Sequence, residues 1–472
     1  MKKKILLLNP PYPSPIIRDN YCCFTSKSGY QWAPTDLLYL SGILNGNRDF
    51  AVSVIDAPGE KASPATVEAK ILQIKPDIIC CLTGTVSFEE DMAFMKEIMD
   101  KSEKKIKLFV LGNTPCFAPL RFLKQFPFVR GVLHNFMDKA VVSVFKGRPH
   151  HCKTCSYRSH GKTGKTIIGS INFDTKRIID GIAPPLYHLF PLNNYSSPTI
   201  KSKPFVTAMT AFGCPFTCSF CIASRLTYHA RDIHEIEKEF KAMKKAGIKE
   251  IFFIDSTFNA NPPFVDIVLK MMIKNKFQFS WSAQIHSFRA TPEFIRLMKK
   301  AGCHTVQIGV ESGNPHILKE YAPSKVKEKI TDAVRVCKEE GLRVLGYFIV
   351  GFPHESKKQA LETIRYAKEL NPDFASFSTM TPDYGTKIYD DALKANSFTD
   401  KETAPLSAFD SSGKAILHNA YLTPKEQDTL AKKAYIEFYL TPKKLFSFLS
   451  DVPRIGLYLR NGMFLIIKKI LG

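Results

Sequence analysis

The stretch TAFGCPFTCSFCIAS (210–224) places three cysteines, Cys214, Cys218 and Cys221, at C-x3-C-x2-C spacing. Structural zinc sites normally use four ligands, and apart from His229 no fourth ligand follows at a usual spacing. Three thiolates can instead hold three irons of a cubane cluster, which leaves the fourth iron open to a substrate or cofactor. This spacing is rare by chance in a chain with 12 cysteines among 472 residues. The stretch therefore predicts a 4Fe-4S cluster rather than three buried structural cysteines.

The region around these cysteines has the pattern of a barrel. Apolar runs predict strands at 205–211, 251–254, 279–285, 306–310, 345–350 and 374–379. Amphipathic stretches between them predict helices near 232–246, 263–274, 292–301, 325–340 and 357–370. Six such units, rather than eight, predict a partial (βα)6 barrel over 204–395. The cysteines follow its first strand, at the edge where barrel enzymes carry their active sites.

Residues 1–150 predict a separate α/β domain. Apolar runs at 5–8, 52–55, 78–82, 108–111 and 129–133 alternate with amphipathic stretches around 37–44, 67–74, 88–99, 120–126 and 141–145. This alternation predicts an open, doubly wound parallel sheet, whose ligands bind beyond the carboxyl ends of the strands. Residues 151–203 are basic and then proline-rich, which predicts a linker. Residues 396–472 predict a helical C-terminal region.

Composition limits the class of protein. The chain is 44% hydrophobic and 23% charged, which is typical of globular rather than disordered proteins. No signal-peptide pattern and no membrane-spanning apolar run is present, so a cytoplasmic protein with reduced thiols is expected. The net charge of +22 suits an anionic partner, or follows from solvated lysine-rich helices such as 238–249. We expect no nucleic-acid partner.

The cysteine stretch also resembles a known family. GCPFTCSFC (213–221) looks like the signature of radical S-adenosylmethionine (SAM) enzymes, with Phe220 before the third cysteine. EIFFIDSTFN (250–259) is similar to the second-strand segment of that family, which lines the methionine part of SAM. The resemblance implies that Asp255 and Thr257 belong to the cofactor site.

The resemblance continues through the later strands. TVQIGVESGN (305–314) resembles the fourth-strand segment, which implies that Glu311 and Ser312 meet polar groups of SAM. GYFIVGFPHES (346–356) is similar to the fifth-strand segment that packs on adenine, through Ile349 and Gly351. TPDYGTKIYD and the earlier WAPTDLLYLSGIL resemble segments of a branch with an N-terminal cobalamin-binding domain. The resemblance thus covers most of residues 1–390.

The family resemblance implies a mechanism. SAM binds the open iron through its amino and carboxylate groups, and an electron from the reduced cluster cleaves its sulfonium. The resulting 5′-deoxyadenosyl radical abstracts hydrogen from an unactivated carbon, while the protein positions the reactants and excludes water. The leading expectation is methyl transfer through cobalamin, with a flavodoxin or ferredoxin as electron donor.

Departures from the branch keep alternatives open. Residues 1–150 contain no D-x-H-x-x-G loop. LGNTPCF (111–117) and VLHNF (132–136) stand where relatives carry Gly-Gly-x-His and Gly-Glu segments. A cobalamin-free radical cyclisation, oxidation or carbon–carbon coupling therefore remains an alternative, as does a non-catalytic homologue that binds a cluster.

Two other features suggest partners or ligands. The tail 443–472 is basic and apolar, with no acidic residue after Asp451. This composition predicts either peripheral contact with the inner face of a membrane or a helix docked on the barrel. The substrate is expected to be a small molecule or a lipid, and membrane contact would favour the lipid. Arg231 is interpreted either as a partner for a SAM or substrate carboxylate or as a surface residue. The group His150, His151, Cys152, Cys155 and His160 is interpreted as part of a solvated linker rather than a second metal site.

Overall fold

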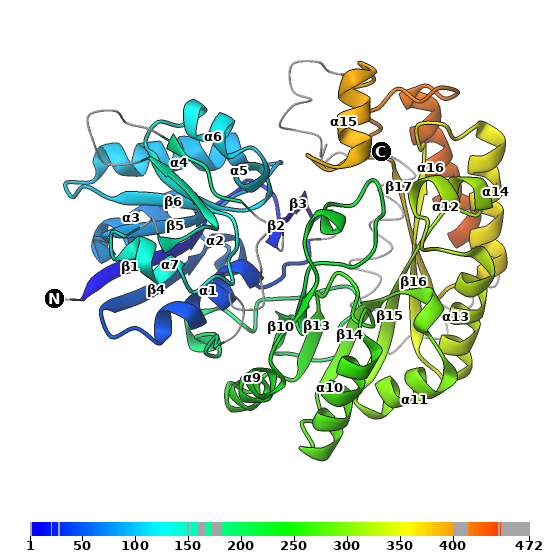
Figure 1. Cartoon of the computed structure of the whole chain (residues 1–472), viewed down its shortest axis with the longest axis horizontal. Coiled ribbons are helices and arrows are strands. Elements are labelled where there is room, and N and C mark those ends of the chain that lie inside the picture. Colours follow the sequence, from blue (N-terminus) through cyan, green and yellow to red (C-terminus); the bar gives the residue numbers. More distant parts are fainter. Residues whose placement is uncertain are drawn as a thin grey trace.

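The computed structural model describes residues 2–19, 21–26, 29–148, 151–158, 166–170, 181–399, 414–441 and 444. Figure 1 shows two α/β bodies that lie against each other, the N-terminal domain in blue to cyan and the barrel domain in green to red. Of the C-terminal tail, only Lys444 belongs to the described residues, and His150 and His160 lie outside them. Among the described residues, no helix combines the length and apolar content required to cross a membrane.

The N-terminal domain contains a seven-stranded sheet with the order β4-β1-β5-β6-β7-β8-β9. Its first five strands in this order are parallel, as predicted: β4 (Phe50–Asp56), β1 (Lys3–Asn9), β5 (Ile78–Leu82), β6 (Lys107–Leu111) and β7 (Val129–Leu133). Ile5 to Leu8 are completely buried, because helices cover a doubly wound sheet on both faces. Those helices are α1 (Thr35–Asn45), α2 (Ala57–Glu60), α3 (Pro64–Ile74), α4 (Phe88–Lys101), α5 (Asn113–Phe117), α6 (Pro119–Gln125) and α7 (Val141–Phe145).

This sheet continues beyond residue 150. Strand β8 (Cys155–Arg158) pairs antiparallel with β7, and β9 (Thr166–Ile167) pairs antiparallel with β8. Part of the segment predicted as a linker therefore extends the N-terminal sheet. Cys152 and Cys155 are buried there, and the Cys155 thiol donates to the carbonyl of Cys152 (3.2 Å).

A hairpin that the sequence did not predict lies at the carboxyl edge of the N-terminal sheet. It consists of β2 (Ile16–Asp19) and β3 (Cys22–Thr25). Arg18 of this hairpin is buried and forms an ion pair with Asp91 at 2.6 Å. It also donates hydrogen bonds to Ser87 (2.9 Å) and Asn9 (2.8 Å). The guanidinium thus fixes the hairpin over the ends of the strands.

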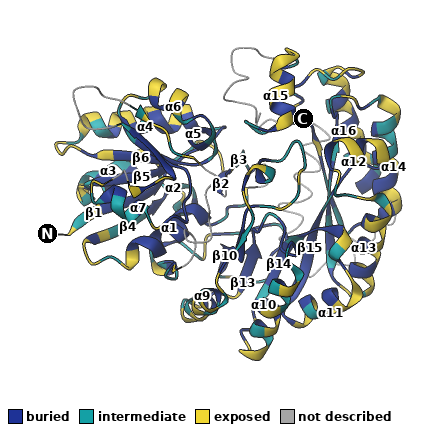
Figure 2. Cartoon of the chain, in the orientation of Figure 1, coloured by how far each residue is buried: buried dark blue, intermediate teal, exposed yellow. Residues whose placement is uncertain are grey.

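The barrel sheet has the order β10-β13-β14-β15-β16-β17 with every pair parallel, which confirms the partial six-stranded barrel. Its strands are β10 (Phe205–Ala208), β13 (Glu250–Phe253), β14 (Ser280–Ile285), β15 (Cys303–Glu311), β16 (Arg343–Val350) and β17 (Phe374–Thr379). Its helices are α9 (Ile233–Lys245), α10 (Pro262–Lys274), α11 (Pro292–Lys300), α12 (Pro315–Tyr321), α13 (Lys327–Glu339) and α14 (Lys357–Leu370). Figure 2 shows the strands as buried and the outer helix faces as exposed.

The last helix covers the open edge of the barrel. Helix α16 (Pro424–Tyr439) follows α15 (Lys387–Lys394), and its Tyr439 hydroxyl donates to the carbonyl of Ala375 in β17 (2.8 Å). The same hydroxyl accepts from the Ala375 amide (2.9 Å). Because β17 ends the sheet, its outer backbone groups would otherwise lack a strand partner. The predicted helical C-terminal region thus protects a strand edge.

The two domains contact each other through buried side chains. The hydroxyls of Thr35 and Thr207 are 2.5 Å apart, and the rings of Trp32 and Phe252 lie 5.2 Å apart. The Tyr39 hydroxyl accepts from the Met209 amide at 2.9 Å. Each pair joins the N-terminal domain to one of the first two barrel strands or the residue that follows. The interface therefore holds the N-terminal domain against the first two strands of the barrel sheet.

Candidate functional site

The three predicted cluster ligands lie in one loop, which a pair of short strands closes at its base. The short strands β11 (Ala211–Phe212) and β12 (His229–Ala230) pair antiparallel and close its base. Gly213 has a φ of +74°, and a Cβ there would collide with the carbonyl of Thr227. Glycine is required at this position because only it combines this backbone conformation with so close an approach. The loop follows β10, at the carboxyl end of the first barrel strand.

The thiols of this loop interact with one another. Cys214, Cys218 and Cys221 are all partly exposed, whereas the other cysteines are buried apart from Cys22. Burial raises the pKa of Cys218 to about 11; the charge of Lys325 opposes this rise, and the charges of Glu311 and Cys214 contribute to it. Burial, the charge of Asp383, and the neighbouring thiols raise the pKa of Cys221. A bound cation reverses this tendency because metal coordination favours the thiolate.

The number and spacing of these thiols along the chain are those expected of cluster ligands. Within the described ranges, no three His, Cys, Asp or Glu side chains converge closely enough to share one metal ion. A cubane cluster binds each thiolate through a different iron, so its ligands stand further apart than those of a mononuclear zinc site. The donor set is therefore compatible with a 4Fe-4S cluster.

Glu311 lies at an irregular position beside this loop. The register of β15 against β16 shifts between Gly309 and Glu311, and Glu311 has a φ of +62°. Its carboxylate is 3.4 Å from the ammonium of Lys325, which also donates to the carbonyl of Gly309 (2.5 Å). Burial raises the pKa of Glu311, and the charge of Lys325 opposes that rise. The same lysine lowers the pKa of Cys218, so it links Glu311 electrostatically to the cysteine loop.

Thr257 approaches the cysteine loop, whereas Asp255 and Ser312 hold the backbone. The hydroxyl of Thr257 is 3.7 Å from the sulfur of Cys214. Asp255 accepts from the Thr210 hydroxyl (2.6 Å) and from the Ala211 amide (2.6 Å), which fastens the chain just before the cysteines. The Ser312 hydroxyl lies 3.0 Å from the Thr363 hydroxyl in α14 and accepts from the Asn314 amide.

Phe220 and Ile349, two of the predicted cofactor residues, are apolar and pack together with Phe352. The rings of Phe220 and Phe352 lie 5.7 Å apart, and Phe220 and Ile349 pack against the same buried cluster. Gly351 has a φ of +85°, and a Cβ there would collide with the Gln427 side chain. The assignment of these residues to adenine remains a prediction.

Several residues near the cysteines were missed by the sequence reasoning. Lys325 follows the helix after the fourth barrel strand, and nothing local in APSKV distinguishes it. His286 directly follows β14, and its ring stacks on Phe216 at 4.1 Å. A polar residue at the carboxyl end of a barrel strand is a usable signal, and it could have identified His286.

One cysteine of the N-terminal domain faces the cluster loop. Cys22 in β3 is accessible to solvent, and yet burial is the largest cause that raises the pKa of its thiol. Asp383 and Cys221 raise its pKa further, so all three side chains lie within electrostatic range. The hairpin therefore brings the N-terminal domain up to the cysteine loop.

Unpaired polar atoms mark the carboxyl edge of the N-terminal sheet. The hydroxyl of Thr114, Nδ1 of His134 and Nδ2 of Asn135 are buried and have no hydrogen-bond partner in the described structure. These residues belong to the two segments that depart from the family pattern. Burial lowers the pKa of His134 to about 4, so its imidazole is neutral. Buried polar atoms without partners are costly, and a bound ligand would satisfy them.

The structure contradicts both interpretations of Arg231 drawn from the sequence, a ligand-binding residue and a surface residue. Its guanidinium is buried and lies 2.7 Å from the carboxylate of Glu239 in α9. It also donates to the carbonyl of Met209 (2.7 Å) and to the Tyr39 hydroxyl (3.1 Å). Arg231 is therefore neither a surface residue nor available to a ligand carboxylate, because its buried ion pair with Glu239 occupies it.

Comparisons with known proteins identify the family. A model of the radical SAM superfamily matches residues 209–367. The chain is 30% identical to the uncharacterized methyltransferase PH0819 of Pyrococcus horikoshii, and the match covers 94% of each protein. This chain therefore belongs to the radical SAM superfamily, and it is an enzyme of the class that uses a 4Fe-4S cluster and SAM.

Two further likenesses concern the whole architecture. The anaerobic magnesium-protoporphyrin IX monomethyl ester cyclase of Cereibacter sphaeroides is 24% identical over 78% of this chain and 61% of its own length. The radical SAM methyltransferase TsrM of Kitasatospora setae, solved with cobalamin and a 4Fe-4S cluster, superposes with a TM-score of 0.70. That match has 15% identity and covers 94% of this chain and 90% of TsrM. The two-domain fold is thus shared with TsrM.

Proposed function

We propose that this protein is a cobalamin-dependent radical SAM methyltransferase that methylates an unactivated carbon. The observation that carries the proposal is the set of unpaired polar atoms on Thr114, His134 and Asn135, at the edge where doubly wound sheets bind ligands. They fit a large polar cofactor such as the nucleotide tail of cobalamin. The shared fold with TsrM supports this choice of cofactor.

The residues of the barrel domain have distinct tasks in this proposal. The thiolates of Cys214, Cys218 and Cys221 hold the cluster, and Asp255 anchors the chain that presents them. Glu311 and Lys325 bind the polar groups of SAM, with their charges already balanced against each other. Phe220 and Ile349 cover the adenine side with apolar surface and exclude water.

When bound, the cluster supplies the electron that cleaves SAM, and cobalamin supplies the methyl group. The protein contributes by holding both cofactors beside one crevice. Cys22 of the N-terminal hairpin and Cys221 of the cluster loop come from opposite domains and lie within electrostatic range of each other, where we place this crevice. Substrate bound there would meet both cofactors. A small molecule or a lipid is proposed as substrate, and a flavodoxin or ferredoxin as electron donor.

A cobalamin-free radical reaction is the second candidate. Cys116, in one of the altered segments, donates to the carbonyl of Leu133 (3.2 Å), and Asn113 accepts from the Thr85 amide (3.0 Å). These bonds join the ends of neighbouring strands. They occupy polar groups of a segment that already differs from the cobalamin-binding pattern of the branch, which favours a crevice without cobalamin. The similarity to the cyclase of Cereibacter sphaeroides supports cyclisation as the reaction class of this candidate.

Corrinoid content distinguishes the two candidates. Protein is produced anaerobically with hydroxocobalamin supplied, the cluster is reconstituted, and bound corrinoid is extracted and quantified per chain. The methyltransferase proposal expects stoichiometric corrinoid, and SAM with a deuterated methyl group should pass that label to the corrinoid. Thr114→Val should lower corrinoid occupancy, because it removes an unpaired buried hydroxyl without changing side-chain size.

Thr429→Val is the matched control, since it removes an exposed hydroxyl in α16. It should leave corrinoid occupancy unchanged. Wild-type protein that cleaves SAM but retains no corrinoid would replace the first candidate with the second. Membrane contact through 443–472 remains a prediction from sequence.

A further inference from the structure

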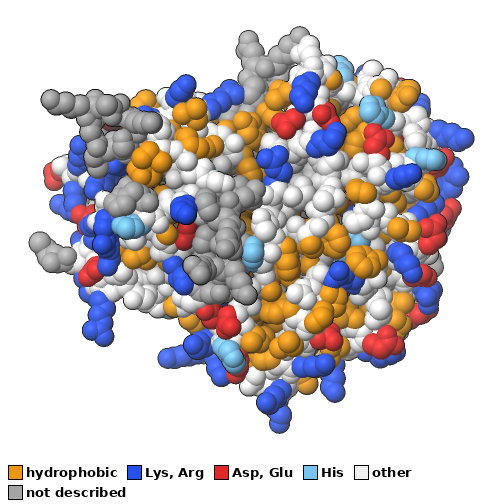
Figure 3. Space-filling model, viewed as in Figure 1, with side chains coloured by type: hydrophobic (Ala, Val, Ile, Leu, Met, Phe, Trp, Pro, Cys, Tyr) orange, Lys and Arg blue, Asp and Glu red, His pale blue; other side chains and the backbone are white. Residues whose placement is uncertain are grey.

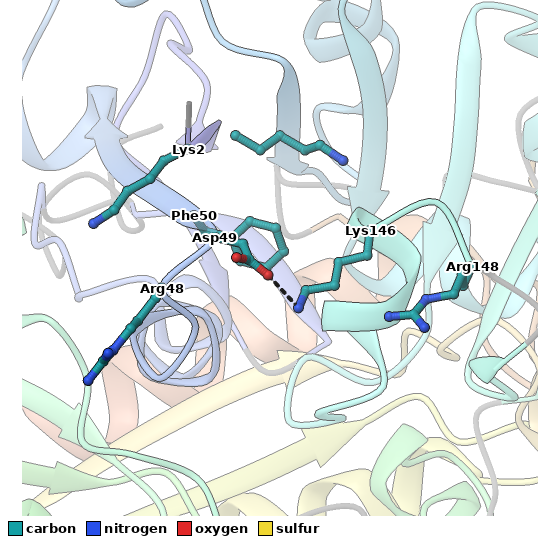
Figure 4. A pocket seen from close by; sticks show the side chains of 7 residues that line it. Lys2, Arg48, Asp49, Phe50, Lys146 and Arg148 are labelled. Atoms are coloured by element: carbon teal, nitrogen blue, oxygen red, sulfur yellow. Dashed lines mark ion pairs between the residues drawn. The ribbon is translucent and has the colours of Figure 1, made fainter.

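A cationic hollow lies at the opposite end of the N-terminal sheet from the cluster loop. Its volume is about 820 Å³, and it opens where β1 and β4 begin and α7 ends. Figure 4 shows its lining from close by. Five cationic side chains contribute to it: Lys2, Lys3, Arg48, Lys146 and Arg148.

The positive charge of this hollow is mostly unbalanced. Its only lining carboxylate, Asp49, is 2.6 Å from Lys146, and that hydrogen bond holds the pKa of Asp49 below its usual value. Lys3 donates to the carbonyl of Phe145 (2.9 Å). In the described part of the chain, no ion pair or side-chain hydrogen bond involves Lys2 or the guanidinium of Arg48 or of Arg148.

Some cationic residues elsewhere in this chain are paired with an acid. On exposed helices, Lys96 pairs with Asp100 at 2.5 Å and Lys241 with Glu237 at 2.7 Å, each one helical turn away. Figure 3 likewise shows acidic side chains among the Lys and Arg side chains of one molecular face. The hollow differs because several cations share one concavity with a single acid.

We infer that this hollow binds a phosphorylated anion with at least two negative charges. Small-molecule pockets are usually apolar, but Phe50 is the only apolar residue of this lining and it is buried. Arg48 and Arg148 offer planar donor pairs that match phosphate oxygens. The hollow has room for more than orthophosphate, so it can take a free diphosphate or nucleotide or the headgroup of a lipid.

This site is separate from the proposed catalytic crevice. The hollow adjoins Lys3 and Phe50, the first residues of paired strands, whereas Thr114 and His134 follow the carboxyl ends of theirs. Ligand binding at the hollow therefore does not depend on corrinoid or SAM.

Calorimetric titration of the full-length protein with pyrophosphate and with ATP tests the soluble sources. Co-sedimentation with phosphatidylcholine vesicles, with and without phosphatidylglycerol, tests the lipid source. We expect saturable binding in at least one arm, weakened at high salt as ion pairing requires. Arg48→Gln/Arg148→Gln should weaken that binding roughly tenfold, because two phosphate donors are lost.

Lys270→Gln/Lys329→Gln is the matched control, since it removes two exposed charges from barrel helices α10 and α13. It should bind like the wild type, and both double variants should cleave SAM normally. Binding of pyrophosphate or ATP alone would assign a soluble ligand, and binding of anionic vesicles alone would assign a lipid headgroup. Absence of binding in every arm, or equal weakening by both double variants, would overturn the inference.

Discussion

The buried pair between Arg231 and Glu239 is predicted to be essential for the stability of the domain interface. Both side chains are about 2% exposed, and their charged atoms lie 2.7 Å apart. The hydroxyls of Tyr39 and Tyr187 also donate to Glu239, at 3.1 and 3.2 Å. Tyr39 belongs to α1 and Tyr187 to the segment between the domains. One carboxylate therefore joins three parts of the chain.

Arg231→Met should destabilise the protein by about 3–5 kcal/mol, since it leaves the Glu239 charge buried without a counterion. The lost stacking of the guanidinium on the Tyr39 ring, 4.9 Å from its centre, adds to this cost. Arg231→Met/Glu239→Gln should recover most of the loss. Glutamine is neutral and keeps an acceptor for the two tyrosine hydroxyls.

Urea unfolding under anaerobic conditions measures this effect through the two tryptophans. Trp32 lies against Phe252 across the domain interface, and Trp281 is buried in the barrel. Arg335→Met is the control, because its pair with Glu339 is more than half exposed and should contribute less than about 1 kcal/mol. If Arg231→Met changed the unfolding free energy no more than this control does, the argument from the buried pair would be refuted.

Three further predictions concern the barrel domain. Cys218→Ala should abolish the visible absorbance of the cluster and SAM cleavage together, and full activity in that variant would exclude Cys218 as a ligand. Glu311→Ala should weaken SAM binding by about 1–3 kcal/mol and leave cluster absorbance intact, because it leaves the partly buried ammonium of Lys325 without its carboxylate partner. Unchanged affinity in equilibrium dialysis would argue for a structural role of Glu311. Burial raises the pKa of Glu355 from 4.5 to about 7, so protonated Glu355 stabilises the fold fully below pH 4.5, and that stability is lost as pH rises through 7. Glu355→Gln should flatten this dependence in urea midpoints measured from pH 5 to 8, and equal slopes in both proteins would contradict the assignment.

The sequence alone determined the features that depend on neighbouring residues. The runs at 5–8 and 78–82 are strands because continuous apolar residues must be buried on both faces of a sheet. The cysteine stretch lies in a single loop, so its resemblance to the radical SAM signature pointed to the family without any knowledge of distant contacts. Predicted strands and helices accordingly match the structure within a few residues over most of the described chain.

Only the tertiary structure decided how distant side chains are used. Arg231 is locally indistinguishable from a surface arginine, and its role depends on Glu239 in α9 and Tyr39 in the other domain. Arg18 likewise acquires its partner Asp91 only when the hairpin folds over the N-terminal sheet. Lys325 meets Glu311 because the strand irregularity turns that carboxylate toward it. Charge pairs of this kind have no sequence period. Each charge loses its water at a junction that only the whole fold creates, and a partner from elsewhere in the chain must offset that cost.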